Sequence, residues 1–295
     1  MKRNNILPTL IGAIAFVSIA TFGVVGFTGL STQKARSNHA EWMTALPDST
    51  KIEDMSIPGT HDSLALYGIG NFIGQCQDLP VSEQLELGAR FLDIRLQVDA
   101  NQMKGVHGIV DQKTNFATTI AELHAFLDAH PKETIFISVK EEEDPVNSTM
   151  TFDECFRKYM EEGRWYTQPT MPETLGEIRG KMVLLSRFST DIGILCNNGW
   201  ADNASFQLGE LFIQDEYRLK DVETKKQAVM NCFANTNKFK INYFSGYLDW
   251  AFPPSYSVEV AKAMNAFAKE TLPSIGNKGI CLFDFISTDL MNLFF

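Results

Sequence analysis

The sequence predicts an α/β fold, and three observations lead to this prediction. Short apolar runs alternate with amphipathic stretches along most of the chain, as strands and helices do in α/β proteins. Roughly eight of the runs have strand character, and a full (β/α) barrel has eight strands in about 250 residues. With 295 residues, 44% of them hydrophobic and 21% charged, the chain is long enough for one such domain. We therefore expect an irregular (β/α) barrel of the TIM type in a single domain.

The first element is an uncharged, apolar segment that follows Lys2 and Arg3 and runs from Asn4 through Gln33. About 20 apolar residues are enough to cross a bilayer, so its length fits a cleaved export signal and also a retained membrane anchor. We expect residues 1–30 to be this signal or anchor, residues 31–41 to be a linker and residues 42–295 to form the barrel. In both cases the barrel would be secreted or extracellular.

The strands and helices of the body are expected to alternate. The expected strands are Ile52–Ile57, Arg90–Val98, Met103–His107, Thr134–Lys140, Met182–Arg187, Leu211–Tyr217, Ile241–Tyr247 and Ile280–Ile286. The expected helices are Val81–Leu87, Phe116–His130, Phe152–Glu162, Val222–Ala234 and Val258–Leu272. Pro58-Gly59 is predicted to be the turn that ends the first strand. Polar residues stand at the carboxyl ends of several strands, where barrels of this class place their chemistry.

Charge and cysteine content exclude some functions. The net charge is −10, and no cluster of Lys and Arg stands out, which argues against nucleic acid as a partner and favours a monomer in solution. The five cysteines form no Cys-x-x-Cys motif, so a zinc ribbon or a thioredoxin-like site is not indicated. One or two disulfides and buried free thiols remain equally open.

Two histidines and an arginine are the candidate reactive groups. His61-Asp62 follows the Pro-Gly turn, and His107 ends a later strand. Asp93 and Arg95 are two residues apart, so they point to the same face of a strand. Each of these groups alone would fit a surface pair or a structural ion pair equally well.

Together, these groups are sufficient to transfer a phosphodiester to a neighbouring hydroxyl. One imidazole removes the hydroxyl proton and the other protonates the leaving oxygen, while a guanidinium holds two phosphoryl oxygens. Carboxylates beside the imidazoles would fix their tautomers. The residues therefore favour a phosphodiester with a vicinal hydroxyl as the substrate class.

The chain resembles the phosphatidylinositol-specific phospholipases C of the bacterial, secreted type, which contain the X domain. The resemblance runs from about Asp54 to Ile286. It is carried by the segments Ile57–Ser63, Gly88–Arg95, Val106–Gly108, Glu133–Lys140, Arg179–Arg187 and Gln214–Tyr217. It implies cleavage of phosphatidylinositol to diacylglycerol and inositol 1,2-cyclic phosphate. It does not separate free phosphatidylinositol from glycosyl-phosphatidylinositol anchors as the substrate.

The resemblance also implies roles for the candidate acid and base. His61 would be the general base that acts on the inositol 2-hydroxyl, supported by a late aspartate that we place at Asp284. His107 would be the general acid for the diacylglycerol oxygen, with Asp62 as its partner.

The resemblance assigns the phosphate to Arg95, which Asp93 would orient. Arg95 stands where the calcium-dependent, eukaryotic relatives hold their metal, so we expect catalysis without a metal or any other cofactor. The acidic stretch Glu141–Asp144 is interpreted as a solvated loop. The residues implied for the inositol site are Lys140, Arg187, Asp215 and Tyr217.

Two alternatives remain in competition with this function. One is a metal-dependent glycerophosphodiester phosphodiesterase on a similar barrel, and the other is a non-catalytic barrel that binds a lipid head group. The substrate implied by the resemblance lies in a membrane surface, and two segments have the aromatic, Gly and Pro content of interfacial loops. These segments are Leu66–Ile73 and Tyr247–Tyr256. Trp200 is a weaker candidate for the rim of the site.

Overall fold

The computed structural model describes residues 39–68, 74–249 and 257–295. The chain divides into the units Met1–Ala35 and Arg36–Phe295, and every described residue belongs to the second unit. The predicted signal or anchor and residues 31–38 of the predicted linker lie outside the described residues. Among the residues described, no helix has the length and apolar character needed to cross a membrane.

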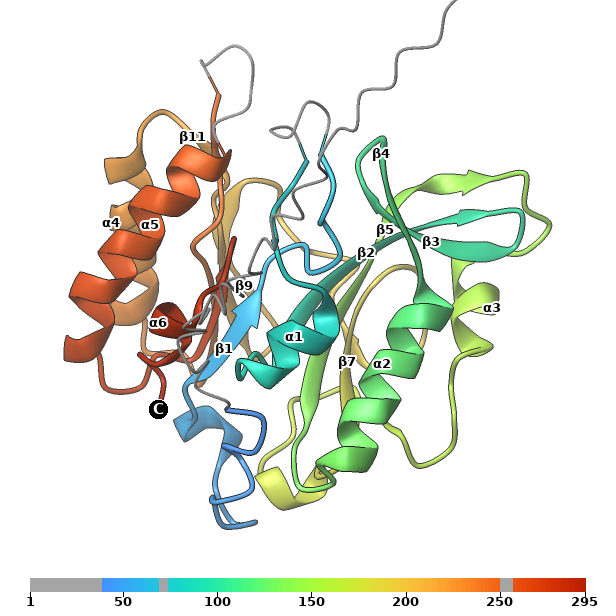
Figure 1. Cartoon of the computed structure of the whole chain (residues 1–295), viewed down its shortest axis with the longest axis horizontal. Helices are drawn as coiled ribbons and strands as arrows, with labels where there is room; N and C mark the ends of the chain where they lie inside the picture. Colours follow the sequence, from blue (N-terminus) through green and yellow to red (C-terminus); the bar gives the residue numbers. More distant parts are fainter. Residues whose placement is uncertain (1–38, 69–73, 250–256) are drawn as a thin grey trace, which may run out of the picture. The chain divides into compact units, whose positions relative to one another are not determined.

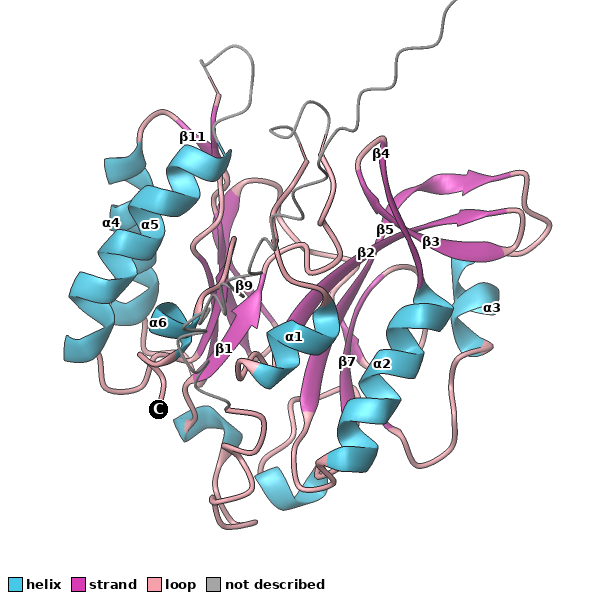
Figure 2. Ribbon diagram, viewed as in Figure 1, coloured by secondary structure: helices cyan, strands magenta, loops and turns pink. Residues whose placement is uncertain are grey.

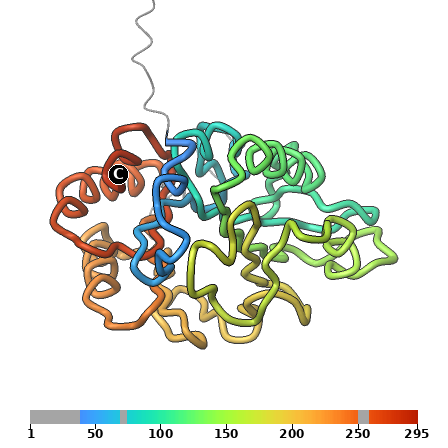
Figure 3. Tube along the Cα trace, turned by 90° about the horizontal axis from the view of Figure 1, so that it is seen from below, coloured from blue at the N-terminus to red at the C-terminus, as the bar shows by residue number. Residues whose placement is uncertain are grey.

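A curled, mainly parallel sheet organises the unit Arg36–Phe295 and confirms the predicted α/β class (Figures 1 and 2). Its central parallel strands follow the order β7-β5-β2-β1-β14-β12-β10. Their bounds are Met182–Arg187, Ile135–Val146, Phe91–Asp99, Ile57–Thr60, Ile280–Phe283, Phe239–Tyr243 and Leu211–Asp215. The chain winds once around, so the first strand, β1, pairs with the last, β14 (Figure 3).

The barrel is open on one side. The edge beyond β7 carries the short parallel strands β6 (Trp165–Tyr166) and β8 (Ile194–Leu195), and the edge beyond β10 carries the antiparallel strand β9 (Ala204–Leu208). Within residues 39–68, 74–249 and 257–295, no strand pairing joins these two edges. This opening is the irregularity in the barrel.

The prediction that Met103–His107 is a strand of the barrel is wrong in its topology. Strand β3 (Gln102–His107) instead folds back antiparallel on β2, and β4 (Val110–Asn115) continues this extension. The turn between β2 and β3 is Ala100-Asn101, and both residues have positive φ, +50° and +63°. Such a two-residue turn joins antiparallel neighbours and cannot lead into a parallel barrel strand.

The first predicted strand is also wrong in its position. Ile52–Asp54 is a 3-10 helix, and strand β1 includes Pro58 and Gly59, which were predicted to form a turn. Pro58 is tolerated because it is the second residue of the strand and β2 begins only opposite Gly59. Gly59 is required because a Cβ there would lie 2.6 Å from the carbonyl oxygen of Phe91.

All five predicted helices are present, and they pack on the outer face of the curled sheet in two groups (Figure 2). One group is α1 (Val81–Glu86), α2 (Phe116–Ala129) and α3 (Phe152–Arg157), and the other is α4 (Val222–Ala234) and α5 (Ser257–Thr271). Side-chain caps from Asn115, Thr151 and Asp221 start α2, α3 and α4. The unit also contains a short helix, α6 (Thr288–Met291), and a two-stranded sheet of β11 (Arg218–Leu219) and β13 (Tyr247–Leu248). Two further 3-10 helices are Leu175–Glu177 and Leu272–Ser274.

The sheet separates an inner apolar core from two outer ones. Phe91 of β2 packs inside with residues such as Phe136 and Leu282, whereas Leu92 and Ile94 pack outside beneath α1 and α2. Because alternate residues of a strand point to opposite faces, Asp93 and Arg95 lie on the inner side with Phe91. The two polar residues therefore point into the barrel at the carboxyl end of β2.

Two features of the body concern residues whose structure the sequence left open. Buried Arg90 pairs with Glu133 at 2.9 Å and donates to the carbonyl oxygens of Ala40 and Leu85 at 2.6 and 2.8 Å, so the end of the predicted linker packs on the barrel. Every cysteine is a buried free thiol, and no disulfide is formed.

Candidate active site

A cavity of about 350 Å³ opens at the carboxyl ends of the parallel strands. This size is typical of a small-molecule site. Eight of the ten predicted site residues line it: His61, Arg95, His107, Lys140, Arg187, Asp215, Tyr217 and Asp284. The other two, Asp62 and Asp93, are fully buried beneath the first group.

His61 and Asp284 are brought together by strand register. Thr60 of β1 pairs with Phe283 of β14, so the next residue of each strand lies beside its counterpart. His61 Nδ1 lies 2.7 Å from Asp284 Oδ1, and His61 Nε2 lies 2.9 Å from Arg95 Nη2. Because the guanidinium can only donate, Nε2 accepts and the proton of the neutral ring resides on Nδ1, facing Asp284. This tautomer keeps the lone pair on Nε2, where it accepts from Arg95.

The pKa of His61 is raised by its surroundings. Burial opposes this shift, because it disfavours the imidazolium, but the carboxylate of Asp284 outweighs burial, with a further contribution from Asp93. Arg95 acts in the opposite direction. The net effect favours the charged ring that forms when His61 accepts a proton.

Arg95 is held by a buried carboxylate on its own strand. Its Nε and Nη2 donate to Asp93 Oδ2 at 3.3 and 3.1 Å, and Arg187 Nη1 donates to Asp93 Oδ1 at 3.5 Å. Burial would raise the pKa of Asp93, but Arg95 and Arg187 outweigh it and hold this pKa well below its usual range. Burial would lower the pKa of Arg95, but Asp93 and Asp62 raise it. Both groups are therefore permanently charged.

His107 stands at the end of β3, where two oxygen acceptors face its Nδ1. Asp62 Oδ2 lies 3.1 Å away and the carbonyl oxygen of Gly74 2.9 Å away, with Cys76 Sγ at 3.7 Å. The His107 side chain is 30% exposed, compared with 13% for His61, so it lies nearer the mouth of the cavity. Nδ1 therefore carries a proton, which leaves Nε2 to face the cavity.

Asp62 occupies an unusual position in both backbone and side chain. Its φ is +40°, in the left-handed region, where a non-glycine residue is under strain. Both carboxylate oxygens are buried without an accepted hydrogen bond, so the contact to His107 is an ion pair by distance but lacks good hydrogen-bond angles. Burial raises the pKa of Asp62, although His107 and Arg95 oppose this shift.

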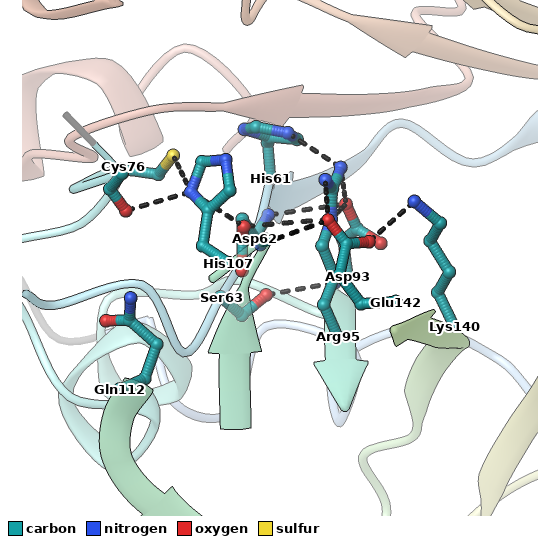
Figure 4. A network of polar contacts seen from close by, with 12 residues as sticks. His61, Asp62, Ser63, Cys76, Asp93, Arg95, His107, Gln112, Lys140 and Glu142 are labelled. Carbon is teal, nitrogen blue, oxygen red and sulfur yellow. Dashed lines mark hydrogen bonds and ion pairs between the residues drawn. The ribbon is translucent and has the colours of Figure 1, made fainter. Parts of the chain in front are cut away.

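Glu142 is a site residue that the sequence interpretation missed, and the prediction of a solvated loop at Glu141–Asp144 is wrong. Strand β5 continues through this stretch and runs beside the cavity. Its pairing with β2 contains bulges there. Glu142 pairs with Lys140 at 2.5 Å and with Arg95 at 3.5 Å (Figure 4). Burial alone would raise its pKa, but Arg95 and Lys140 lower it to about 2. Lys140 and Glu142 are two residues apart, the same spacing that placed Asp93 beside Arg95.

Arg187 and Asp215, at the end of β10, line another part of the cavity wall, and Trp200 contacts both of them. The guanidinium of Arg187 lies 3.8 Å from the centre of the Trp200 ring, and the Trp200 indole donates to Asp215 Oδ2 at 2.9 Å. Trp200 thus supports two of the predicted site residues.

Tyr217 was predicted to share a strand face with Asp215, but β10 ends at Asp215. Buried Lys225 donates to Gln214 Oε1 at 2.9 Å and to the carbonyl oxygen of Glu216 at 2.7 Å, which turns the chain after the strand. Tyr217 reaches the cavity from this turn and donates to Asp202 at 2.5 Å. Its pKa is raised to about 12, first by burial and then by Asp202.

The side chains of His61, Arg95 and His107 converge on one space (Figure 4). Lys140 lies beyond Arg95, and Glu142 lies between Arg95 and Lys140. His61 presents an accepting nitrogen, and His107 presents Nε2, which donates when that ring is protonated at both nitrogens. A guanidinium of fixed charge lies beside the accepting ring. This arrangement suits acid–base chemistry on an anionic substrate.

Comparison with known proteins points to one family. The model of "Phosphatidylinositol-specific phospholipase C, X domain" matches residues 55–188. The "1-phosphatidylinositol phosphodiesterase" of Staphylococcus aureus is 32% identical over 267 residues, which cover 77% of this chain and 84% of that protein. The protein of the same name from Listeria monocytogenes is 29% identical over 262 residues, covering 83% of this chain and 80% of the relative.

Solved structures show the same likeness. A phosphatidylinositol-specific phospholipase C from S. aureus superimposes with a TM-score of 0.77 at 26% identity and covers 88% of this chain and 98% of its own. The enzyme of that name from L. monocytogenes gives a TM-score of 0.69 at 25% identity, with 87% and 97% covered. The open, curled sheet is therefore shared with bacterial proteins of known structure.

Proposed function

The chain belongs to the phosphatidylinositol-specific phospholipase C X-domain family, and on this premise we propose how its residues cleave phosphatidylinositol. The products are diacylglycerol and inositol 1,2-cyclic phosphate. The observation that carries the proposal is the convergence of His61 with Asp284, His107 with Asp62, and Arg95 in one cavity.

His61 is the general base. Its Nε2 takes the proton of the inositol 2-hydroxyl, and the oxygen of that hydroxyl forms the new bond to phosphorus. Asp284 accepts from Nδ1 at 2.7 Å and stabilises the imidazolium that results.

His107 is the general acid. As the bond from phosphorus to the diacylglycerol oxygen breaks, Nε2 gives that oxygen a proton. Asp62 and the Gly74 carbonyl hold one proton on Nδ1, and the proton that is transferred is a second one, on Nε2, so the ring is neutral after the step. The product is a cyclic diester, and water is not consumed.

Arg95 binds the phosphoryl oxygens through two N–H groups while charge builds on them. Asp93 keeps its guanidinium in place on β2. Because this cation is part of the chain, the step requires no divalent ion. The two carboxylates nearest this guanidinium, Asp93 and Glu142, are paired with arginine and lysine, which speaks against the carboxylate cluster of a metal-dependent glycerophosphodiesterase.

The inositol ring is bound by Lys140, Arg187, Asp215 and Tyr217, to which we add Glu142. The proposal is supported by their position on the wall of the same cavity. They comprise two cations, two carboxylates and a phenol, so they offer both donors and acceptors to a ring of hydroxyl groups.

Contact with the membrane is proposed for the two predicted interfacial segments, one of which begins at Tyr247 on the cavity wall. Tyr67 is 43% exposed and carries Lys113 4.2 Å above its ring. Residues 69–73 and 250–256 of the two predicted interfacial segments lie outside the described residues. The apolar N-terminal segment supports export of the barrel out of the cell. There the barrel would meet the membrane surface that contains its substrate.

The pH dependence tests the assignment of the base. His61 must be neutral to act, and its raised pKa places the acid limb of kcat/KM above the ordinary histidine value of about 6.5. Asp284→Asn removes the main raising charge, so the acid limb should move to lower pH while the plateau falls. Asp128→Asn, in a surface pair with Arg164, is the matched control and should leave the profile unchanged. An acid limb that stays in place in Asp284→Asn would contradict the coupling of His61 to this carboxylate.

A further inference from the structure

The wall of the cavity beside His107 contains a thiol that the proposed reaction does not use. Cys76 precedes α1, and its backbone N–H donates to the carbonyl oxygen of Ala65 at 2.9 Å. Its side chain lines the cavity, and the sulfur points at the imidazole of His107 (Figure 4).

The atoms around His107 Nδ1 have the spacing of ligands on one small metal ion. Cys76 Sγ lies 3.7 Å from this nitrogen and Asp62 Oδ2 lies 3.1 Å from it, and the three ligand atoms are all within 4.8 Å of one another. Two ligands bonded to one zinc ion at about 2.0–2.3 Å and a tetrahedral angle lie about 3.3–3.7 Å apart. Small shifts of the side chains would therefore complete the site, and the Gly74 carbonyl oxygen lies beside it, 2.9 Å from Nδ1.

Asp62 is the independent observation that points to a ligand. Its side chain is fully buried, and neither carboxylate oxygen accepts a hydrogen bond from any described residue. The basic nitrogens near Asp62 Oδ2 are His107 Nδ1 at 3.1 Å and Arg95 Nε at 3.7 Å. Buried carboxylates are normally satisfied by hydrogen bonds, so these lone pairs are available to a cation that enters from the cavity.

A second group, His61, Cys76 and Asp284, has comparable spacing. There, however, the carboxylate already takes part in a 2.7 Å contact with His61 Nδ1, which a metal would have to replace. The group around His107 is therefore the more favourable of the two.

We propose that Asp62, Cys76 and His107 form an inhibitory site for a soft divalent ion such as Zn²⁺ or Cd²⁺. Thiolate, imidazole and carboxylate are the ligands that these ions prefer, whereas Ca²⁺ and Mg²⁺ require oxygen ligands alone. Binding releases the protons of Sγ and Nδ1 to solvent. A ring bonded to metal through Nδ1 cannot become an ordinary imidazolium, so it loses its use as the acid. The inhibition rests on the proposed role of His107, but the binding itself does not.

Cadmium binding is the direct test. Titration of the protein with Cd²⁺, followed by the ultraviolet charge-transfer absorption of a cadmium thiolate, should saturate in the wild type and disappear in Cys76→Ser. Cys155→Ser is the matched control, because this buried thiol faces the carbonyl oxygen of Asn101 and does not line the cavity. The control should keep the signal. A wild type without the signal, or a Cys76→Ser variant that retains it, would overturn the proposal.

Zinc inhibition is the second readout, measured on phosphatidylinositol vesicles with free Zn²⁺ set by a metal buffer. Each variant is compared with its own activity without metal. Cys76→Ser should raise the half-inhibiting concentration by at least ~10-fold, because loss of a second-sphere partner alone costs 10- to 100-fold in affinity. Equal sensitivity of Cys76→Ser and wild type would overturn the inhibitory role. If the cadmium signal behaves as expected but the protein does not cleave phosphatidylinositol, the metal site stands and the proposed function fails.

Discussion

His61→Ala and His107→Ala should each lower turnover of phosphatidylinositol by about 10²–10⁴-fold, the usual contribution of one general acid or base. His61 would no longer remove the proton of the 2-hydroxyl, and His107 would no longer protonate the leaving oxygen. Initial rates on phosphatidylinositol vesicles, with the melting temperature measured in parallel, check both losses.

The matched control for both variants is His124→Ala. This histidine pairs with Glu161 at 3.5 Å on the outer surface and should be dispensable for turnover. The folds of the two site variants should remain intact, because neither ring is part of an apolar core. Near-normal turnover in either variant would show that the ring is not the acid or base, and loss of the fold in His61→Ala would show a structural role instead.

Arg95→Lys should lower turnover by about 10²–10³-fold, which corresponds to the ~3–4 kcal/mol lost with one preorganised donor to the transition state. Lysine keeps the positive charge but loses the planar fork that binds two phosphoryl oxygens at once. If Arg95 only neutralised Asp93, lysine would largely replace it. The measurement is kcat/KM on phosphatidylinositol in the presence of a chelator.

Arg164→Lys provides the control, since Arg164 pairs with Asp128 at the surface and should tolerate the exchange. A second result bears on the same residue. Wild-type activity should persist in excess chelator, because Arg95 supplies the cation. Full activity of Arg95→Lys would mean that the fork is not used on the phosphate.

The parts of the site that the sequence predicted are those set by strand periodicity. Asp93 and Arg95 lie on one face because β2 is regular there, and the apolar neighbours Leu92 and Ile94 are buried on the other face as expected. The partnership of His61 with Asp284 required the register of β1 and β14, which brings together residues 223 positions apart. One sequence contains no signal for that register, and the family resemblance supplied the residue.

The parts that could not be predicted depend on irregular backbone. Glu142 was taken for a solvated residue because four acidic residues follow Lys140, and only the bulged pairing of β5 with β2 shows that it faces the cavity. Tyr217 lies beyond the end of β10, in a turn held by Lys225 from α4. Cys76 reaches His107 from a segment that has no secondary structure of its own. These placements are tertiary, and local propensity does not specify them.

The account depends most on the claim that the chain's own residues close a cyclic phosphate without a metal. Phosphorus NMR of the head-group products from phosphatidylinositol vesicles in excess chelator tests this claim most directly. The account predicts that the first product is inositol 1,2-cyclic phosphate, formed together with diacylglycerol. An acyclic inositol phosphate as the first product, or a reaction that stops in chelator and returns on addition of calcium, would contradict it.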